Sequence, residues 1–185
     1  MGGISKKAPK TGASRVWRFI PSKIPIMIAI IAVDIDPSKF IRAKELGATH
    51  CFDSRNNDTI EEIRELTKGG VDFAIDLAGV IPAMNTAYEL IRYGGAVVTA
   101  GLSPINTQFS FNHSDLVAQE KSILGSYMGS CVPVRDVPRF LNLFQQGRLP
   151  VDKLIDGKIT FDDLNEGFDK LSNGEVVRQI LMPNA

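Results

Sequence analysis

Cysteine and histidine are scarce in this chain of 185 residues, which holds only Cys51, Cys131, His50 and His113. The two cysteines lie 80 positions apart, and no CxxC motif or Cys/His cluster occurs. Because a disulfide framework or a zinc site needs several such residues at short spacings, neither is indicated. The expected location is the reducing cytoplasm.

Long apolar runs are also lacking, since none reaches the roughly 18 residues that a membrane span requires. With 44% hydrophobic and 23% charged residues, the composition is that of a soluble globular protein without a membrane partner. Three arginines near residues 135–148 are interspersed with apolar residues, so no nucleic-acid partner is expected.

The formal net charge is zero, but it is unevenly distributed. Residues 1–33 contain six Lys or Arg and no acidic residue, which leaves 15 basic against 21 acidic residues in the remainder. A basic head is compatible with a nucleic-acid arm or a targeting peptide, and the apolar run 24–33 resembles a short signal core. No small-residue cleavage site follows, and the run passes directly into "DIDPSK", so a buried strand is the favoured interpretation.

A glycine-rich phosphate loop is the most informative absence. The stretch "IIAVDIDPSK", residues 30–39, is typical of the second strand of a dinucleotide-binding fold, which normally follows a GxGxxG turn by about 20 residues. The glycines upstream are Gly2, Gly3 and Gly12, and they match neither GxGxxG nor the P-loop pattern. The stretches "GSYMGS" and "GKIT" fail as well. The sequence therefore encodes no cradle for a pyrophosphate.

Glycine-punctuated apolar runs alternate with helical patterns along the chain. Strands are predicted at residues 30–34, 49–53, 71–79 and 94–102, with helices at 36–46, from 57 or 58 to 69, and at 82–91. Further along, we expect a short edge strand in "TQFSF", a helical turn at 114–119, a strand at 122–127, helices at 133–146 and 161–171, and strands in "KLIDGKIT" and "EVVRQILMP". The pattern predicts an α/β fold, a Rossmann-like parallel sheet with helices on both faces but without its usual first strand.

Asp34 and Lys39 are the candidate binding residues that local sequence supports. A carboxylate at the carboxyl end of a parallel strand accepts hydrogen bonds from an adenosine ribose, and its charge disfavours the extra phosphate of NADP. An aspartate after an apolar strand is also common in folds without this function, and a lysine in a first helical turn is often only solvated. The two residues alone leave both interpretations open.

Several longer stretches occur together in a recognisable order: "IIAVDIDPSKFIRAKELGATHCFDSRN", "GGVDFAIDLAG", "GGAVVTAGL", "EKSILGSYMGS", "RDVPRFLNLFQQGRLPVDKLI" and "LNEGFDKLSNGEVVRQILMP". Over about residues 30–183 the chain resembles the cofactor-binding half and C-terminus of zinc-dependent medium-chain alcohol dehydrogenases. The resemblance implies NAD as cofactor, a small alcohol or aldehyde as substrate, and a zinc-dependent hydride transfer.

The resemblance also implies particular contacts. Asp34 and Lys39 correspond to the residues at the adenosine ribose. Leu77, Ala78 and Val80 correspond to a loop beside the adenosine half, and Ala100, Gly101 and Leu102 to a turn beside the nicotinamide. Leu124 matches a position on the nicotinamide side, and Arg178 matches an arginine that reaches the pyrophosphate. No catalytic residue and no zinc ligand is carried over, so zinc is an expectation of the family without ligands in this chain.

The chain also departs from the family pattern. The Cys/His-rich catalytic domain and the first strand with its GxGxxG turn have no counterpart here, and residues 16–29 stand where the family runs directly into "IIAVD". We therefore divide the chain into an atypical basic and apolar segment, residues 1–29, and an incomplete dinucleotide-binding domain, residues 30–185. Part of the insert, "IPIMIAI", is apolar enough to fill the empty strand position or to extend the second strand.

The expected function follows from these departures. The chain is predicted to be a partial NAD-binding domain of an alcohol dehydrogenase that binds NAD weakly and does not catalyse hydride transfer alone. The alternatives are a non-catalytic nucleotide-binding or dimerisation module, which would form a homodimer through edge strands near Ser122 to Tyr127, and a gene fragment without a selected function.

Overall fold

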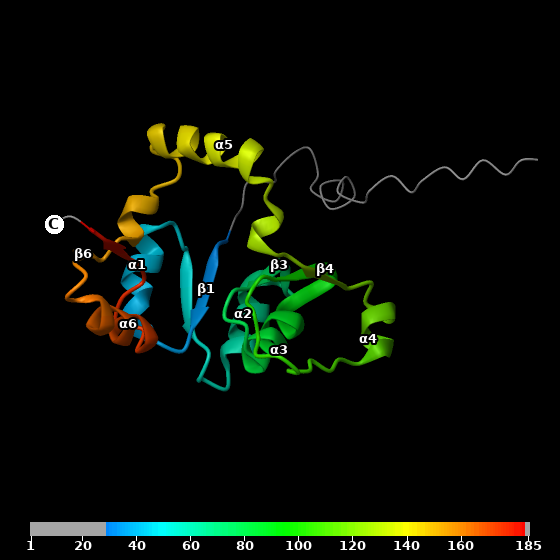
Figure 1. Ribbon diagram of the computed structural model, residues 1–185. Coiled ribbons are helices and arrows are strands. Elements are labelled where there is room, and N and C mark those ends of the chain that lie inside the picture. Colours follow the sequence, from blue (N-terminus) through cyan, green and yellow to red (C-terminus); the bar gives the residue numbers. More distant parts are fainter. Residues whose placement is uncertain (1–28, 184–185) are drawn as a thin grey trace, which may run out of the picture. The chain divides into compact units, whose positions relative to one another are not determined.

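The computed structural model describes residues 29–183 (Figure 1), so the atypical segment 1–29 lies outside the described residues except for Ala29. The chain divides into two compact units, one that ends at Thr59 and one that begins at Ile60. Every strand pair in the two units is parallel. The predicted α/β class with parallel sheets is therefore confirmed.

The first unit is a β-α-β arrangement. Strand β1 (Ile31–Asp34) pairs with β2 (His50–Asp53), and between them lie the 3-10 turn η3 (Pro37–Lys39) and helix α1 (Phe40–Glu45). The Asp36 side chain accepts a hydrogen bond from Ser38 N at 3.0 Å, and Pro37 supplies a preset φ at the first helical position, which agrees with a helix predicted from residue 36. Within residues 29–59 no hydrophobic side chain is fully buried.

The second unit is built around a three-stranded sheet in the order β3-β4-β5. Its elements are α2 (Thr59–Thr67), β3 (Val71–Asp76), α3 (Ile81–Leu90), β4 (Ile91–Thr99), α4 (His113–Ala118) and β5 (Ser122–Gly125). Helix α3 packs on β3 and β4, and Met84, Ala87 and Tyr88 meet Val97 there to form the core. Core residues on α3 recur at helical spacing, which is why its predicted position is confirmed.

Two predictions in this unit are corrected. Strand β4 begins at Ile91 and not at Gly94, because Val71 pairs with Ile91 while Phe73 pairs with Ala96, so the intervening residues bulge out of the register. The predicted edge strand in "TQFSF" does not form. Instead the rings of Phe109 and Phe111 pack near Tyr88, with ring centroids 6.0 and 6.2 Å from that of Tyr88. Side-chain packing therefore holds this segment in place without strand pairing.

The remaining elements are the 3-10 turns η4 (Met128–Ser130) and η5 (Val151–Leu154), helices α5 (Pro133–Gln145) and α6 (Leu164–Ser172), and strands β6 (Gly157–Ile159) and β7 (Gln179–Leu181). Strands β6 and β7 pair in parallel. Gly167 lets α6 approach them closely, because a Cβ atom there would lie 2.8 Å from Ile159 Cδ1 and from Gln179 Oε1. Among the described helices, none combines the length and hydrophobicity needed to cross a membrane.

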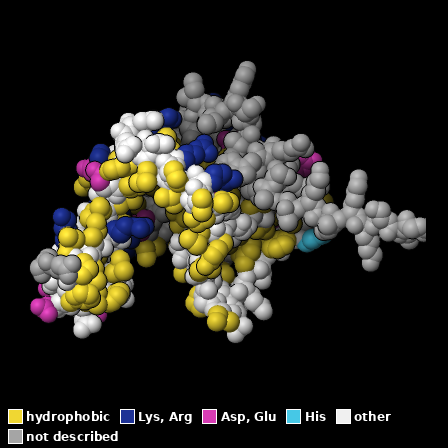
Figure 2. Space-filling view, turned by 45° about the horizontal axis from the view of Figure 1, so that its top comes forward, with side chains coloured by type: hydrophobic (Ala, Val, Ile, Leu, Met, Phe, Trp, Pro, Cys, Tyr) yellow, Lys and Arg dark blue, Asp and Glu magenta, His cyan; other side chains and the backbone are white. Residues whose placement is uncertain are grey.

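Strand β3 exposes an apolar face. Phe73 and Ile75 alternate along it and are 57% and 66% exposed, although the composition of the strand is that of a buried one. Apolar side chains are visible over much of the face shown in Figure 2. Within the described residues β3 pairs only with β4, so it is an edge strand.

The buried Val97 provides a test of the core. Val97 is fully buried, so Val97→Ala should remove packed methyl groups and lower the free energy of unfolding by about 2 kcal/mol. Val134→Ala on α5 is the matched control, because Val134 is 91% exposed and should change stability little. Urea unfolding followed by circular dichroism measures both. Equal effects of the two substitutions would contradict the assigned core.

The start of α5 predicts a pH dependence. The Asp136 carboxylate accepts hydrogen bonds from Arg135 at 2.7 Å and from Val132 N at 2.8 Å, and these contacts lower the pKa of Asp136 to about 2. Because the pKa is lower in the folded state, the stabilisation is complete above about pH 4 and is lost as the pH falls through about 2.

Asp136→Asn should therefore unfold at lower urea concentration than the native chain at pH 7, and the difference should vanish near pH 2. Asp162→Asn, which changes an exposed carboxylate by the same charge, should match the native chain at pH 7. A difference that stayed constant between pH 7 and pH 2 would contradict the role of the ionised carboxylate.

Candidate functional site

Asp34 ends β1, where its Oδ1 accepts hydrogen bonds from Asp36 N at 2.9 Å and from Lys39 Nζ at 3.4 Å. The two predicted ribose residues are thus brought together as an ion pair, with both side chains partly exposed. Both contacts fall on Oδ1, which leaves Oδ2 to accept a hydrogen bond from a ligand hydroxyl. The position at the carboxyl end of a parallel strand is the one that sequence predicted.

A second carboxylate lies next to Asp34, and sequence reasoning missed it. Asp53 ends β2 and is the register partner of Asp34. Arg55 binds it through two nitrogen atoms, at 2.7 Å for Nη2 and 3.0 Å for Nε, and this hydrogen bonding lowers the pKa of Asp53. The pKa of Asp36 is also lowered, chiefly by its hydrogen bonds from Ser38. A strand that ends in Asp and is followed by Arg was the available signal.

In the second unit Asp76 organises the ends of two strands. Its side chain is buried at the end of β3, where Oδ1 accepts hydrogen bonds from Ala78 N at 3.0 Å and Gly79 N at 3.3 Å. Its Oδ2 accepts a hydrogen bond from Thr99 Oγ1 at 2.9 Å. The Asp76 carbonyl accepts hydrogen bonds from the N–H groups of Ala100 and Gly101, at 2.9 and 3.2 Å. One residue therefore ties the turn after β3 to the turn after β4.

These two turns approach each other closely at glycine. A Cβ atom on Gly101 would lie 2.1 Å from Gly79 N, and Gly79 itself adopts a positive φ of 66°. Ser103 Oγ donates a hydrogen bond to the Gly79 carbonyl at 2.7 Å and fixes the contact from the other side. Ala78, Ala100 and Gly101, three of the predicted site residues, are thus neighbours in the structure.

Three more of the predicted site residues, Leu77, Val80 and Leu102, lie in or next to the same two turns. Leu77 and Leu102 are 74% and 80% exposed, which excludes a core role for either side chain. Val80 precedes α3, where its carbonyl accepts a hydrogen bond from Met84 N at 3.1 Å. The exposed leucines offer apolar surface to a ligand at the strand ends.

A hollow of about 390 Å³ opens at the carboxyl ends of β4 and β5. Its walls are Thr99 at the end of β4 with residues 100–102 of the following turn, and Gly125 at the end of β5 with Ser126 and Tyr127. Main-chain atoms and small side chains therefore line most of it, and Leu102 and Tyr127 supply apolar surface. A hollow at this edge of a parallel sheet is where ligands of α/β proteins bind.

Two predicted residues lie elsewhere in the second unit. Leu124 sits within β5 as the register partner of Val98 and does not line the hollow. Arg178 precedes β7, where its N–H donates a hydrogen bond to Asp156 Oδ2 at 3.2 Å. Within residues 29–183 the structure gives Arg178 no hydrogen bond to the paired turns.

The residues do not fit a metal ion. Among the described residues no group of three or more His, Cys, Asp or Glu side chains is arranged to hold one. Cys51 and Cys131 are free thiols. The zinc expected from the resemblance therefore has no ligand set in the described part of the chain.

Several known proteins are similar to this chain in sequence and in fold. The chain is 32% identical to alcohol dehydrogenase 2 of Zea mays over 155 residues, which cover 82% of this chain and 41% of that protein. Benzyl alcohol dehydrogenase from Acinetobacter calcoaceticus superimposes with a TM-score of 0.79 at 33% identity, over 83% of this chain and 42% of that one. A protein from Sinorhizobium meliloti described as a zinc-binding dehydrogenase and bound to NADP gives 0.73 at 27% identity, over 84% and 45%.

The chain thus spans less than half the length of the relatives that it matches. The family model described as zinc-binding dehydrogenase matches residues 26–146, which is more than half of the chain and includes Asp34, Asp76 and the paired turns. The resemblance found in the sequence is thereby confirmed: the chain belongs to the zinc-binding dehydrogenase family.

Proposed function

We propose that this chain supplies the cofactor-binding part of an NAD-dependent oxidoreductase that exchanges a hydride with a small alcohol or aldehyde. The observation that supports the proposal most is the pair of turns held together by Asp76 beside the hollow at the ends of β4 and β5. The relatives named alcohol dehydrogenase and the relative solved with NADP support the reaction class and the type of cofactor.

Asp34 and Lys39 take the adenosine ribose in this proposal. Oδ2 of Asp34 accepts a hydrogen bond from a ribose hydroxyl. Lys39, whose Nζ lies 3.4 Å from Oδ1 of Asp34, donates a hydrogen bond to the sugar oxygens. The negative charge of Asp34 repels a phosphate on the 2′ position, so NAD is preferred over NADP. This chain would differ in that respect from the relative that binds NADP.

The second unit contributes main-chain and apolar contacts. Leu77, Ala78 and Val80 are assigned to the adenosine half, and Ala100, Gly101 and Leu102 to the nicotinamide and its ribose. Leu124 is assigned to the nicotinamide side and Arg178 to the pyrophosphate. For the residues of the two turns the support is position, because these turns end neighbouring strands of one parallel sheet. Leu124 and Arg178 lie outside the two turns, and their assignments depend on the resemblance alone.

Binding should be weak, because the pyrophosphate has few donors. In related folds the N–H groups of a glycine turn at a helix start hold this anion. The sequence has no such turn, and among the described residues no ligand set for zinc exists. The chain by itself is therefore a binding part, and we do not expect it to oxidise an alcohol.

We also propose that the chain forms a homodimer through edge strands near Ser122 to Tyr127. Among the described residues β5 pairs only with β4, which leaves its other edge open to a strand from a second copy. The two free cysteines suit the cytoplasm, the compartment that we propose.

Asp34 offers a test of cofactor choice. Calorimetric titration of the full chain should give NADH a dissociation constant weaker than the low micromolar range, with NADPH about tenfold weaker still because of charge repulsion. Asp34→Asn should remove most of this difference. Asp58→Asn, an exposed aspartate of the same unit, is the matched control and should retain it. Tight NADH binding, or equal binding of NADH and NADPH by the native chain, would refute the assignment.

Gly101 tests whether the paired turns form the site. Gly101→Ala places a methyl group against Gly79 N, so it should lower the free energy of unfolding by about 1–3 kcal/mol and weaken NADH binding further. Gly157→Ala is the control, since a Cβ atom there has nothing within 4 Å. Urea unfolding and NADH titration of both variants measure the two effects. Native NADH affinity in a folded Gly101→Ala chain would place the cofactor elsewhere.

A further inference from the structure

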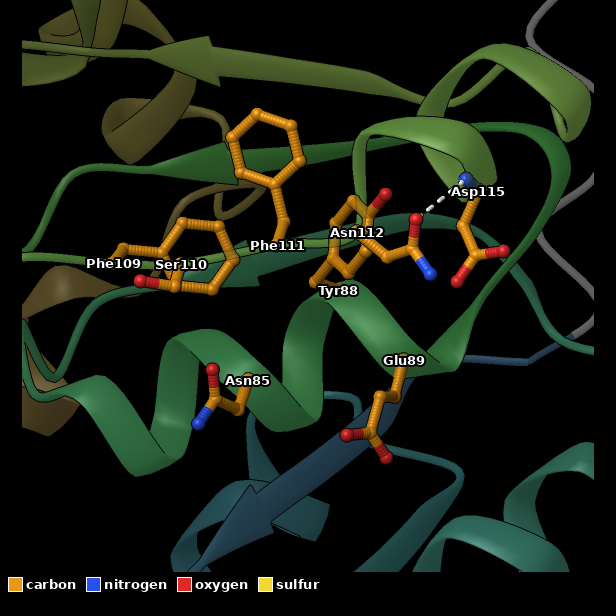
Figure 3. A pocket seen from close by; sticks show the side chains of 8 residues that line it. All are labelled: Asn85, Tyr88, Glu89, Phe109, Ser110, Phe111, Asn112 and Asp115. Atoms are coloured by element: carbon orange, nitrogen blue, oxygen red, sulfur yellow. Dashed lines mark hydrogen bonds between the residues drawn. The ribbon is translucent and has the colours of Figure 1, made fainter.

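A second hollow, of about 220 Å³, lies between α3 and the segment that leads into α4 (Figure 3). It shares no lining residue with the hollow at the strand ends. Its volume is below the roughly 300–1,000 Å³ that is common for pockets of drug-sized ligands. The hollow therefore suits a small molecule or a single chemical group.

One wall of this hollow is aromatic. Tyr88 rises from α3, and Phe109 and Phe111 come from the segment before α4, as Figure 3 shows. The three ring centroids lie 6.0 to 6.2 Å apart, with Phe109 and Phe111 stacked at 28°. The faces of such rings carry partial negative charge and attract cations.

Tyr88 also carries an unsatisfied polar atom. The residue is only 8% exposed, and its hydroxyl oxygen has no hydrogen-bond partner among the described residues. Burial, and secondarily the charge of Asp115, raises the pKa of Tyr88, so the hydroxyl stays neutral and able to accept a hydrogen bond. A buried polar atom without a partner is costly. The hydroxyl is closed to solvent, so the Tyr88 ring, and not its hydroxyl, lines the hollow.

All the charged side chains that line the hollow are acidic. Glu89 comes from α3 and Asp115 from the first turn of α4, and within the described residues neither carboxylate has a hydrogen bond or an ion pair. Asn112 is already engaged, since its Oδ1 caps α4 by accepting a hydrogen bond from Ser114 N at 2.9 Å. The carboxylates are thus the polar groups that a charged ligand would meet.

Two basic side chains lie near the hollow but do not line it. Lys121 Nζ donates a hydrogen bond to the Tyr88 carbonyl at 3.2 Å and sits 4.7 Å from the centroid of the Tyr88 ring. Arg64 donates to the Glu89 carbonyl at 2.9 Å. Both therefore satisfy carbonyls at the C-terminal end of α3. Burial and the charge of Arg64 lower the pKa of Lys121, whereas the carboxylates of Asp115 and Glu89 act in the opposite direction. The faces of Phe109 and Phe111 are left for a ligand.

We propose that the hollow between α3 and α4 binds a small organic cation, an ammonium or guanidinium group on a short apolar stem. The stem packs on Phe109 and Phe111, and the cation lies between Glu89 and Asp115. Aromatic faces combined with carboxylates form the usual surroundings of such cations in proteins.

The proposal can be tested by amide NMR on the full chain labelled with ¹⁵N. It is titrated with 2-phenylethylammonium, with the uncharged 2-phenylethanol, and with the anion phenylacetate. The cation should shift the amide signals of Tyr88, Ser110 and Asp115 until the site is saturated. The alcohol should bind at least about fivefold more weakly than the cation, because it lacks the charge.

Three variants and one control assign the contacts. Asp115→Asn and, separately, Glu89→Gln should each weaken binding of the cation about fivefold, and Phe111→Leu should weaken it although it keeps an apolar side chain. Asp162→Asn, which removes the same charge at an exposed position, should bind as the native chain does. Equal affinity for cation and alcohol, tighter binding of the anion, or no shift at the three amides would overturn the proposal.

Discussion

The carboxylate and carbonyl of Asp76 are the contacts on which the candidate site of the second unit depends. Burying a carboxylate is costly unless its oxygen atoms are satisfied, and both oxygens of Asp76 accept hydrogen bonds. The donors come from the turn that follows β3 and from Thr99 at the end of β4, so the cost of burial is offset only when both strand ends are in place. The close approach of Gly79 and Gly101 follows from this arrangement.

Strand β3 has an apolar face and a backbone edge that the described residues leave uncovered. A strand that carries Phe73 and Ile75 on one face and Ala74 and Asp76 on the other is typical of the interior of a parallel sheet, where both faces are covered. Helix α3 covers the face of Ala74, and the other face is largely exposed. The strand also has a free edge within the described residues, and it lacks the lysines or prolines that protect natural edges. The apolar face of Phe73 and Ile75 is therefore exposed because a strand with the composition of an interior strand lies at the edge of this sheet.

Sequence reasoning was most successful where the signal was local. The helix start at Asp36 and Pro37, the approximate span of α3, and the position of Asp34 at a strand end all depend on residues within a few positions of one another. It was less successful where contacts with residues distant in the sequence determine the local structure. The early start of β4 results from its pairing with Val71, and the segment around Phe109 is held by Tyr88, 21 positions away. No local pattern contains either fact.

The candidate site residues show the same contrast between local sequence signals and contacts that only the fold provides. Asp76 was not singled out from the sequence, although it ends an apolar strand as Asp34 does. Only the structure shows that Asp76 is buried and links two turns, whereas Asp34 is partly exposed. Identical local patterns thus led to different chemistry, because burial is set by the neighbouring strand. Thr99 on β4 gives Asp76 its second partner, whereas the register partner of Asp34 is Asp53, another carboxylate.

The first unit gives a physical reason why the proposed preference for NAD and the proposed weak affinity would go together. Asp34 and Asp53 end paired strands, Asp36 follows β1 immediately, and hydrogen bonds lower the pKa of Asp36 and Asp53 so that both remain ionised. A carboxylate favours a hydroxyl donor such as a ribose and disfavours a phosphate. Lys39 and Arg55 lie nearby, but each is engaged with one of these carboxylates. The same negative charges that would select NAD over NADP therefore give no attraction to the pyrophosphate that both cofactors share.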